Sequence, residues 1–462
     1  MSTSESPPQS HSLISSVTSR HRSGYITNRY SPEDGQDILL RLAGKMVPFF
    51  VGPLPARGFL NTFLHPSPTP PPFEEGMFNP LIELCSGSEH ETRWYDEFVS
   101  SDPRHPLHLF LGLFLPFQMQ IISSHVPNLT LVNTSNAEDP AAEFPYGLKP
   151  NCLAYAKPEG GGKDVEGLGC SHVDFIIEIK SGSDPFVDKS FNSRQFDADS
   201  EVLNPFVCPS GSAREALGQL TAYASAVLGT QYRTHMFMVF VVKNYARLIR
   251  WDRSGALVTE RIYFNKQSYL LDFFIRYDIA SRGARGHDTT VSLPSQDEIE
   301  LAKAIVPESK QEKPLLAVQH SGCRYIICSP EPRPSIPVGR WARSSIAFDT
   351  KNRRRVLLKD SWRLLLKELI PEGDIYCRLH DARVPNIPSL LSAGDVGNDQ
   401  HHQSQTDQAI HNLIPNHSSW ALTPHRHYRI VLGIIGRKLE KFKQTWEVVH
   451  HQKSFREFAL SQ

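Results

Sequence analysis

The sequence predicts an α/β-type (α+β) protein that is built from two successive units. In the larger front part, short apolar runs of strand length alternate with segments of helical periodicity. This pattern is typical of a mixed sheet with helices packed on it. A second group of strand-like runs follows, and one of these ends in a lysine just before an amphipathic segment. We therefore expect a larger mixed-sheet unit followed by a smaller sheet unit.

Length and composition limit the classes of function. The chain has 462 residues, which is enough for two or three domains. Its 49 basic residues balance 49 acidic ones, so we expect neither a nucleic-acid partner nor an anionic membrane. It has no run of about 18 apolar residues, and the Ser/Pro-rich start lacks the apolar core of a secretory signal. Seven scattered cysteines without metal-ligand spacing predict reduced thiols, no metal site, and a cytoplasmic or nuclear protein.

The first unit is expected to follow a disordered tail, residues 1–31, and to span residues 32–291. Helical periodicity and apolar runs predict its elements. The expected helices are Asp37–Met46, Ala213–Leu228 and Tyr269–Arg276, and the expected strands are Asn128–Val132, Asn151–Tyr155, His172–Lys180, Met236–Val242, and a hairpin of Ala246–Trp251 with Thr259–Phe264.

A nuclease-like motif lies at the end of one buried strand. Strand alternation puts Glu178 and Lys180 on one side, where a carboxylate could hold Mg²⁺ and a lysine could orient water. Gln219 and Tyr223 share a helix face one turn apart, as in some nucleases of the PD-(D/E)xK fold. That pattern also needs an upstream aspartate, but Asn151 stands in its place, and its amide is a poor Mg²⁺ ligand. We expect a nuclease-like fold in which Glu178 and Lys180 form a residual ion pair.

The second unit is expected to span residues 313–462 after a linker, residues 292–312, that acts as a hinge. A polar stretch, residues 395–419, is expected to form a loose insertion. The expected strands are Arg324–Cys328, Ser345–Asp349, Val356–Lys359 and Tyr428–Ile434, and the expected helices lie at Glu298–Ile305, within Asp360–Leu379 and at Arg437–Val449.

The lysine strand and the helix after it have the order found in a protein kinase small lobe, but these residues alone favour a surface lysine at a strand end, and the surrounding stretches decide for the kinase. In that lobe a strand lysine reaches the nucleotide phosphates, and a helix glutamate holds the lysine in place. Lys359 and Glu372 have this order. The stretches VGRWARSSIAFD, VLLKDSWR, EGDIYCRLHDARVPNIP and HYRIVLGIIGRKLEKF resemble the fungal-type protein kinase family, as do QLTAYASAVLGTQYRTHMFMVFVVKNYARLIRWDRSGALVTERI and RGHDTTVS upstream. The resemblance runs from about Met46 to about Val449 in the right order.

The resemblance implies ATP-dependent phosphorylation of protein Ser/Thr, with ATP and Mg²⁺ as cofactors. It also implies that Lys359, Glu372 and Gly339 contact the nucleotide. Family members are richer in glycine around Gly339, where backbone amides must approach phosphate closely. Here Trp341 would crowd that approach, so ATP binding is in question.

The catalytic part of a kinase is missing from this sequence. Neither His-Arg-Asp-x-x-x-x-Asn nor Asp-Phe-Gly follows Arg437–Val449, so we expect no catalytic residues and no phosphoryl transfer. The sequence favours a partial kinase domain that acts as a pseudokinase or a module binding a protein partner. Two alternatives stay open: a residual Mg²⁺-dependent nuclease of the PD-(D/E)xK type, and a non-functional gene fragment.

Overall fold

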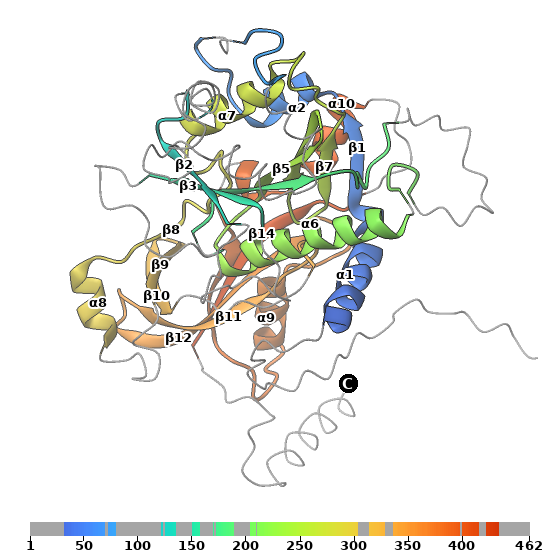
Figure 1. Cartoon of the computed structure of the whole chain (residues 1–462). Helices are drawn as coiled ribbons and strands as arrows, with labels where there is room; N and C mark the ends of the chain where they lie inside the picture. The colour runs from blue at the N-terminus through green and yellow to red at the C-terminus, as the bar shows by residue number, and fades with distance from the viewer. Residues whose placement is uncertain are drawn as a thin grey trace, which may run out of the picture.

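The described part of the chain forms two sheets, each of seven strands. Figure 1 shows the first sheet in the upper part of the molecule and the second sheet below it. Two sheets with helices packed on them confirm the predicted α+β fold. The computed structural model describes residues 32–69, 73–79, 122, 125–134, 150–157, 170, 172–188, 204–208, 210–303, 314–328, 336–397, 400–414 and 422–433.

The first sheet has the order β1-β7-β6-β5-β4-β3-β2. Its pairs are antiparallel except β4 with β5 and β1 with β7, which are parallel. The crossover between β4 and β5 carries a long helix, as parallel strands require. The strands are β1 (Phe50–Leu54), β2 (Leu129–Asn133), β3 (Cys152–Ala156), β4 (Phe175–Lys180), β5 (Met236–Val242), β6 (Tyr245–Trp251) and β7 (Ala256–Thr259).

Helices cover both faces of the first sheet. Along β5, Met236, Met238 and Phe240 belong to one apolar core, whereas Phe237 and Val239 belong to the core on the opposite face. Both faces of the sheet are therefore shielded from water, which explains why β5 is apolar at every position. The segments around this sheet are α1 (Pro32–Met46), η1 (Val47–Phe49), α2 (Ala56–Phe63), α6 (Gly211–Thr230) and α7 (Tyr269–Ile279).

Most local predictions for this unit agree with the structure, and the hairpin differs. The prediction for Met236–Val242 has the bounds of β5, and Ala213–Leu228 lies inside α6. The hairpin strand that pairs with β6 is Ala256–Thr259, whereas Ile262, inside the predicted Thr259–Phe264, forms an isolated bridge with Ala246 of β6. The turn is short, because the Asp252 amide donates to the Gly255 carbonyl at 3.0 Å, and the partner strand starts three residues earlier than predicted.

The second sheet has the order β13-β14-β12-β11-β10-β9-β8, and all of its pairs are antiparallel. Helices α8 and α9 pack against it. The strands are β8 (Val291–Ser292), β9 (Leu315–His320), β10 (Cys323–Cys328), β11 (Arg343–Asp349), β12 (Arg354–Leu364), β13 (Leu390–Asp395) and β14 (His425–Leu432), and the helices are α8 (Gln296–Lys303) and α9 (Glu372–Asp381).

Alternation along β12 gives this sheet two different faces. Val356 and Leu358 belong to a core that also includes Tyr232 of the first unit. Leu357 lies on the opposite face, in a core with Tyr376 of α9. One face of the second sheet therefore packs toward the first unit, and the other carries α9.

The predicted linker is structured in its described part. β8 already pairs with β9, and Ala302 of α8 packs against Ala317, Ile326 and Phe348 of the second sheet. The predicted helix at Glu298–Ile305 corresponds to α8, which ends at Lys303 in the described residues. These contacts join α8 to the second unit.

The predicted loose insertion was wrong in its described part. Within residues 395–419 the structure has η6 (Gln400–His402) and α10 (Thr406–Leu413). Ala409 and Ile410 of α10 lie in the apolar core of the first unit, and Figure 1 shows α10 beside α2. Together with the partly buried Leu413, these residues pack α10 against a core that is distant in sequence, and Asp252 accepts hydrogen bonds from the Gln405 and Thr406 amides at the start of the helix.

Two predictions, the tail of residues 1–31 and the helix Arg437–Val449, lie outside the described residues. Among the helices that the structure describes, none is long and apolar enough to cross a membrane.

Candidate functional site

Lys359 and Glu372 lie together on the α9 face of the second sheet. Lys359 is in the middle of β12, which runs on to Leu364, and Glu372 is the first residue of α9. The Lys359 Nζ atom lies 2.7 Å from each carboxylate oxygen of Glu372. Both side chains keep more than a quarter of their surface exposed, so a ligand can reach the ammonium group. The carboxylate also sits at a helix N-terminus, where the helix dipole favours negative charge.

A close contact with the sheet fixes the start of α9. The Tyr428 hydroxyl accepts a hydrogen bond of 3.1 Å from the Gly373 amide. A Cβ atom at Gly373 would lie 2.4 Å from the Ala393 Cβ atom and 2.6 Å from the Tyr428 hydroxyl. Only glycine lets the helix approach β13 and β14 this closely, and this approach places Glu372 over Lys359.

Gly373→Ala is expected to push α9 away from the sheet and to separate Glu372 from Lys359. Overpacking of this kind costs about 1–3 kcal/mol of the free energy of unfolding, measured by urea titration. Gly394→Ala is the matched control, because a Cβ atom there meets nothing within 4 Å. Its expected change is within about 0.5 kcal/mol. Equal losses in both variants would contradict this account of Gly373.

Gly339 is tied to the first unit. Its amide donates to the Arg253 carbonyl at 2.8 Å, so this N–H is not available to a phosphate. Its φ of +99° is one that glycine adopts without strain. The next carbonyl, that of Arg340, accepts from the Trp362 amide at 2.7 Å. The structure thus brings Lys359 and Glu372 together, whereas the Gly339 amide bonds to the first unit. The predicted contacts of all three residues with a nucleotide stay predictions.

Three residues of the nuclease-like motif also meet: Asn151, directly before β3, and Glu178 and Lys180 on β4. Lys180 Nζ lies 2.9 Å from Glu178 Oε1, and Glu178 is almost fully buried. The side-chain oxygen of Asn151, Oδ1, accepts a hydrogen bond of 2.7 Å from the Ile179 backbone amide. The backbone amide of Asn151 donates to Glu178 Oε2 at 3.4 Å. Asn151 therefore stabilises β4, and its side-chain oxygen already accepts a hydrogen bond from the backbone of that strand.

The two remaining residues of the motif lie on α6, and the nearby Asp174 belongs to another network. Tyr223 of α6 is buried in the apolar core, and Gln219 is half-buried on the same helix. Asp174 accepts from the Ala156 amide at 2.8 Å and lies 3.2 Å from His287. Burial alone would raise the pKa of Asp174, but His287 and Arg233 hold it well below its usual range. The motif thus offers Glu178 alone, where a Mg²⁺ nuclease needs two acidic ligands.

Comparison with known proteins identifies the family. A model of the family described as fungal protein kinase matches residues 206–451, which is more than half of the chain. The chain belongs to the fungal protein kinase family. The family match begins just before α6, so it includes both the second half of the first sheet and the described part of the second. No curated protein and no solved structure matched the chain.

Sequence reasoning missed a buried polar network between the two units of this kinase-family chain. His427 Nε2 lies 2.9 Å from Asp360, and the Nδ1 atoms of His427 and His402 are 3.0 Å apart. Asp288, His402 and His427 together form a group of three buried residues that could hold a metal ion. However, Arg429 Nη2 already lies 2.6 Å from Asp288 Oδ2, and this guanidinium opposes a second cation. These residues are far apart in sequence, so spacing could not reveal them.

Proposed function

We propose that this member of the fungal protein kinase family is a kinase-like module that binds Mg-ATP through Lys359 without transferring its phosphoryl group. The supporting observation is the contact of 2.7 Å between Lys359 Nζ and the Glu372 carboxylate. This is the arrangement by which kinases hold a lysine toward nucleotide phosphates. The 462 residues contain neither a His-Arg-Asp nor an Asp-Phe-Gly sequence, so the proposal for these residues is limited to binding.

The proposal depends strongly on Lys359, because the loop at Gly339 is already hydrogen-bonded to the first unit. Because the Gly339 amide donates to Arg253, it cannot also cradle a phosphate. Lys359 would then supply the main positive charge at the phosphates, with Glu372 as its positioning residue. No comparable observation supports a nuclease, because Glu178 has no acidic neighbour in the motif and pairs with Lys180.

The test is thermal unfolding with and without Mg-ATP. A ligand that binds only the folded state raises the melting temperature, and at a hundredfold excess over its Kd it adds about 2.7 kcal/mol. We expect a rise in the wild-type chain and its loss in Lys359→Ala. Lys351→Ala, which changes an exposed turn lysine, is the matched control and should keep the rise.

Two outcomes would contradict the proposal. One is a cooperative melt that Mg-ATP leaves unchanged. The other is a steady release of phosphate from ATP that disappears in Lys359→Ala, which would show phosphoryl transfer by these residues.

A further inference from the structure

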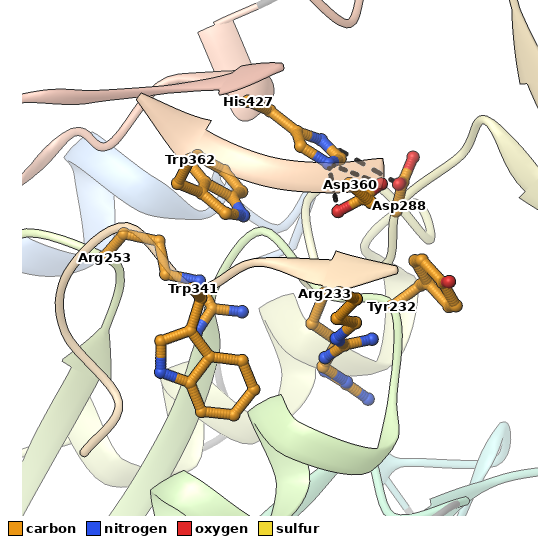
Figure 2. Close-up of a pocket in the computed structure, with 9 residues that line it drawn as sticks. Tyr232, Arg233, Arg253, Asp288, Trp341, Asp360, Trp362 and His427 are labelled. Atoms are coloured by element: carbon orange, nitrogen blue, oxygen red, sulfur yellow. Dashed lines mark hydrogen bonds and ion pairs between the residues drawn. The ribbon is translucent and has the colours of Figure 1, made fainter. Parts of the chain in front are cut away.

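A pocket lies between the two units, on the face of the second sheet opposite α9. It opens to solvent, and its enclosed part is small. Figure 2 shows the Arg253 side chain running between the indole rings of Trp341 and Trp362. Cationic and aromatic side chains dominate the lining, and its residues are Tyr232, Arg233, Arg253, Asp288, Trp341, Arg343, Asp360, Trp362 and His427.

Arg253 is a buried cation with an unused donor. It lies in the turn between β6 and β7 and is 2 % exposed. One of its terminal nitrogens, Nη1, donates to the Pro337 carbonyl at 3.1 Å, but Nε has no acceptor among the described residues. Its Cζ atom lies 4.5 Å from the ring centre of Trp341 and 5.8 Å from that of Trp362. Aromatic faces partly stabilise this guanidinium, but they do not satisfy its N–H groups.

Arg343 brings a second guanidinium to the same indole ring. Its Nη2 donates to the carbonyls of Leu228 and Gln231, at the C-terminal end of α6. Its Nη1 is buried and has no acceptor in the described part of the chain. The Arg343 Cζ atom lies 5.6 Å from the ring centre of Trp341 and 4.8 Å from that of Tyr232. Two unsatisfied donors from different units therefore border one pocket.

Within the described residues neither of these arginines forms an ion pair, although the charges of Asp360 and Asp252 act on Arg253. The carboxylates of the lining, Asp288 and Asp360, are both paired with Arg429, and no carboxylate of the described residues forms an ion pair with Arg253 or Arg343. Burial and then the charge of Arg343 lower the pKa of Arg253 to about 9, which still leaves it protonated at neutral pH. Buried charges without partners are costly, and a negative ligand removes that cost.

We propose that this pocket binds a small oxyanion of the phosphate type, which accepts hydrogen bonds from Arg253 and Arg343 beside Trp341. Guanidinium groups match the geometry of phosphate oxygens and form short charge-assisted hydrogen bonds with them. The enclosed part of the pocket is too small for a nucleotide.

The oxyanion site is separate from the proposed nucleotide site. Along β12, Asp360 and Trp362 line the pocket, whereas Lys359, directly before Asp360, faces α9. Alternation of side chains along a strand keeps the two sites on opposite faces. Binding at one site can therefore be measured when the other is empty or mutated.

The test is thermal unfolding of the full chain in sodium phosphate and in sodium chloride of equal ionic strength. Phosphate also stabilises proteins in general by exclusion from their surface, so variants must separate the two effects. We expect a larger rise in phosphate for the wild type than for Arg253→Gln. Arg363→Gln changes an arginine of β12 that pairs with Asp395, and it should keep the full rise.

Fluorescence of the wild type gives an independent readout, because Trp341 and Trp362 line the pocket. Phosphate should change the emission in a saturable way, and loss of the Arg253 donors should weaken the apparent affinity about tenfold or more. Glycerol phosphate in place of phosphate shows whether the bound group is a free ion or a phosphate ester. A rise of the same size in all three proteins, or a wild type that responds to Zn²⁺ and to no oxyanion, would overturn the proposal.

Discussion

Arg429→Met is expected to lower the free energy of unfolding by about 3–5 kcal/mol, because it leaves two buried carboxylates without their shared cation. Arg429 is fully buried on β14. Its Nε donates to Asp360 at 2.7 Å, and its Nη2 donates to Asp288 at 2.6 Å. Its Nη1 donates to the Thr290 hydroxyl at 2.6 Å and to the Gln319 carbonyl at 2.9 Å. The Arg429 side chain thus joins β14 of the second sheet to Asp288 and Thr290, in the segment that follows α7.

The matched control is Arg363→Met on the neighbouring strand. Arg363 also forms a two-point ion pair, with Asp395 at 2.7 and 2.8 Å, but 22 % and 37 % of the two side chains are exposed. Water screens such a pair, so its loss should cost about 1 kcal/mol or less. Urea titration of both variants gives the two values. Similar small losses in the two proteins would mean that the buried network does not hold the units together.

Local sequence patterns predicted the elements that are stabilised locally. β5 is apolar at every position and α6 repeats its apolar residues at helical spacing, so each pattern is complete within one segment. The pairing of Lys359 with Glu372 was predictable for the same reason, since one strand, one turn and one helix start bring them together. The contact at Gly373 that fixes this pairing was not predictable, because it depends on Tyr428 and Ala393 of later strands.

Segments that depend on distant partners escaped prediction. β13 contains a glycine and small residues, and it forms a strand because it pairs with β14. α10 has few apolar residues, and it is fixed because Ile410 enters the core of the first unit. Likewise, Arg253, Arg343 and Arg429 look like ordinary surface arginines in sequence. Their burial between two units is a property of the packed structure alone.

Acidification from pH 7 to pH 4 is expected to destabilise the protein by several kcal/mol, because three buried histidines are neutral in the folded state. Burial lowers the pKa of His235 well below its usual value. Burial and then the charge of Arg429 lower the pKa of His320 to about 4, and burial with Arg233 does the same for His287. Unfolded histidine has a pKa of about 6.5.

The direction of the effect follows from proton binding. Between about pH 6.5 and pH 4 the unfolded chain takes up protons that the folded chain refuses, so stability is full above this range and falls as the pH drops through it. A pKa difference of this size corresponds to about 3 kcal/mol for each histidine. Below pH 4, protonation of Asp360 adds to the loss, because His427 and Arg429 hold its folded pKa well below the usual range despite its burial.

His320→Gln isolates one of these histidines. His320 is 5 % exposed at the end of β9, whereas the side chain of His411 on α10 is 72 % exposed and provides the control. Urea titrations from pH 7 to pH 4.5 should show a slope smaller by about one proton in His320→Gln and an unchanged slope in His411→Gln. A wild-type free energy of unfolding that stays constant over this range would show that the buried histidines accept protons without cost.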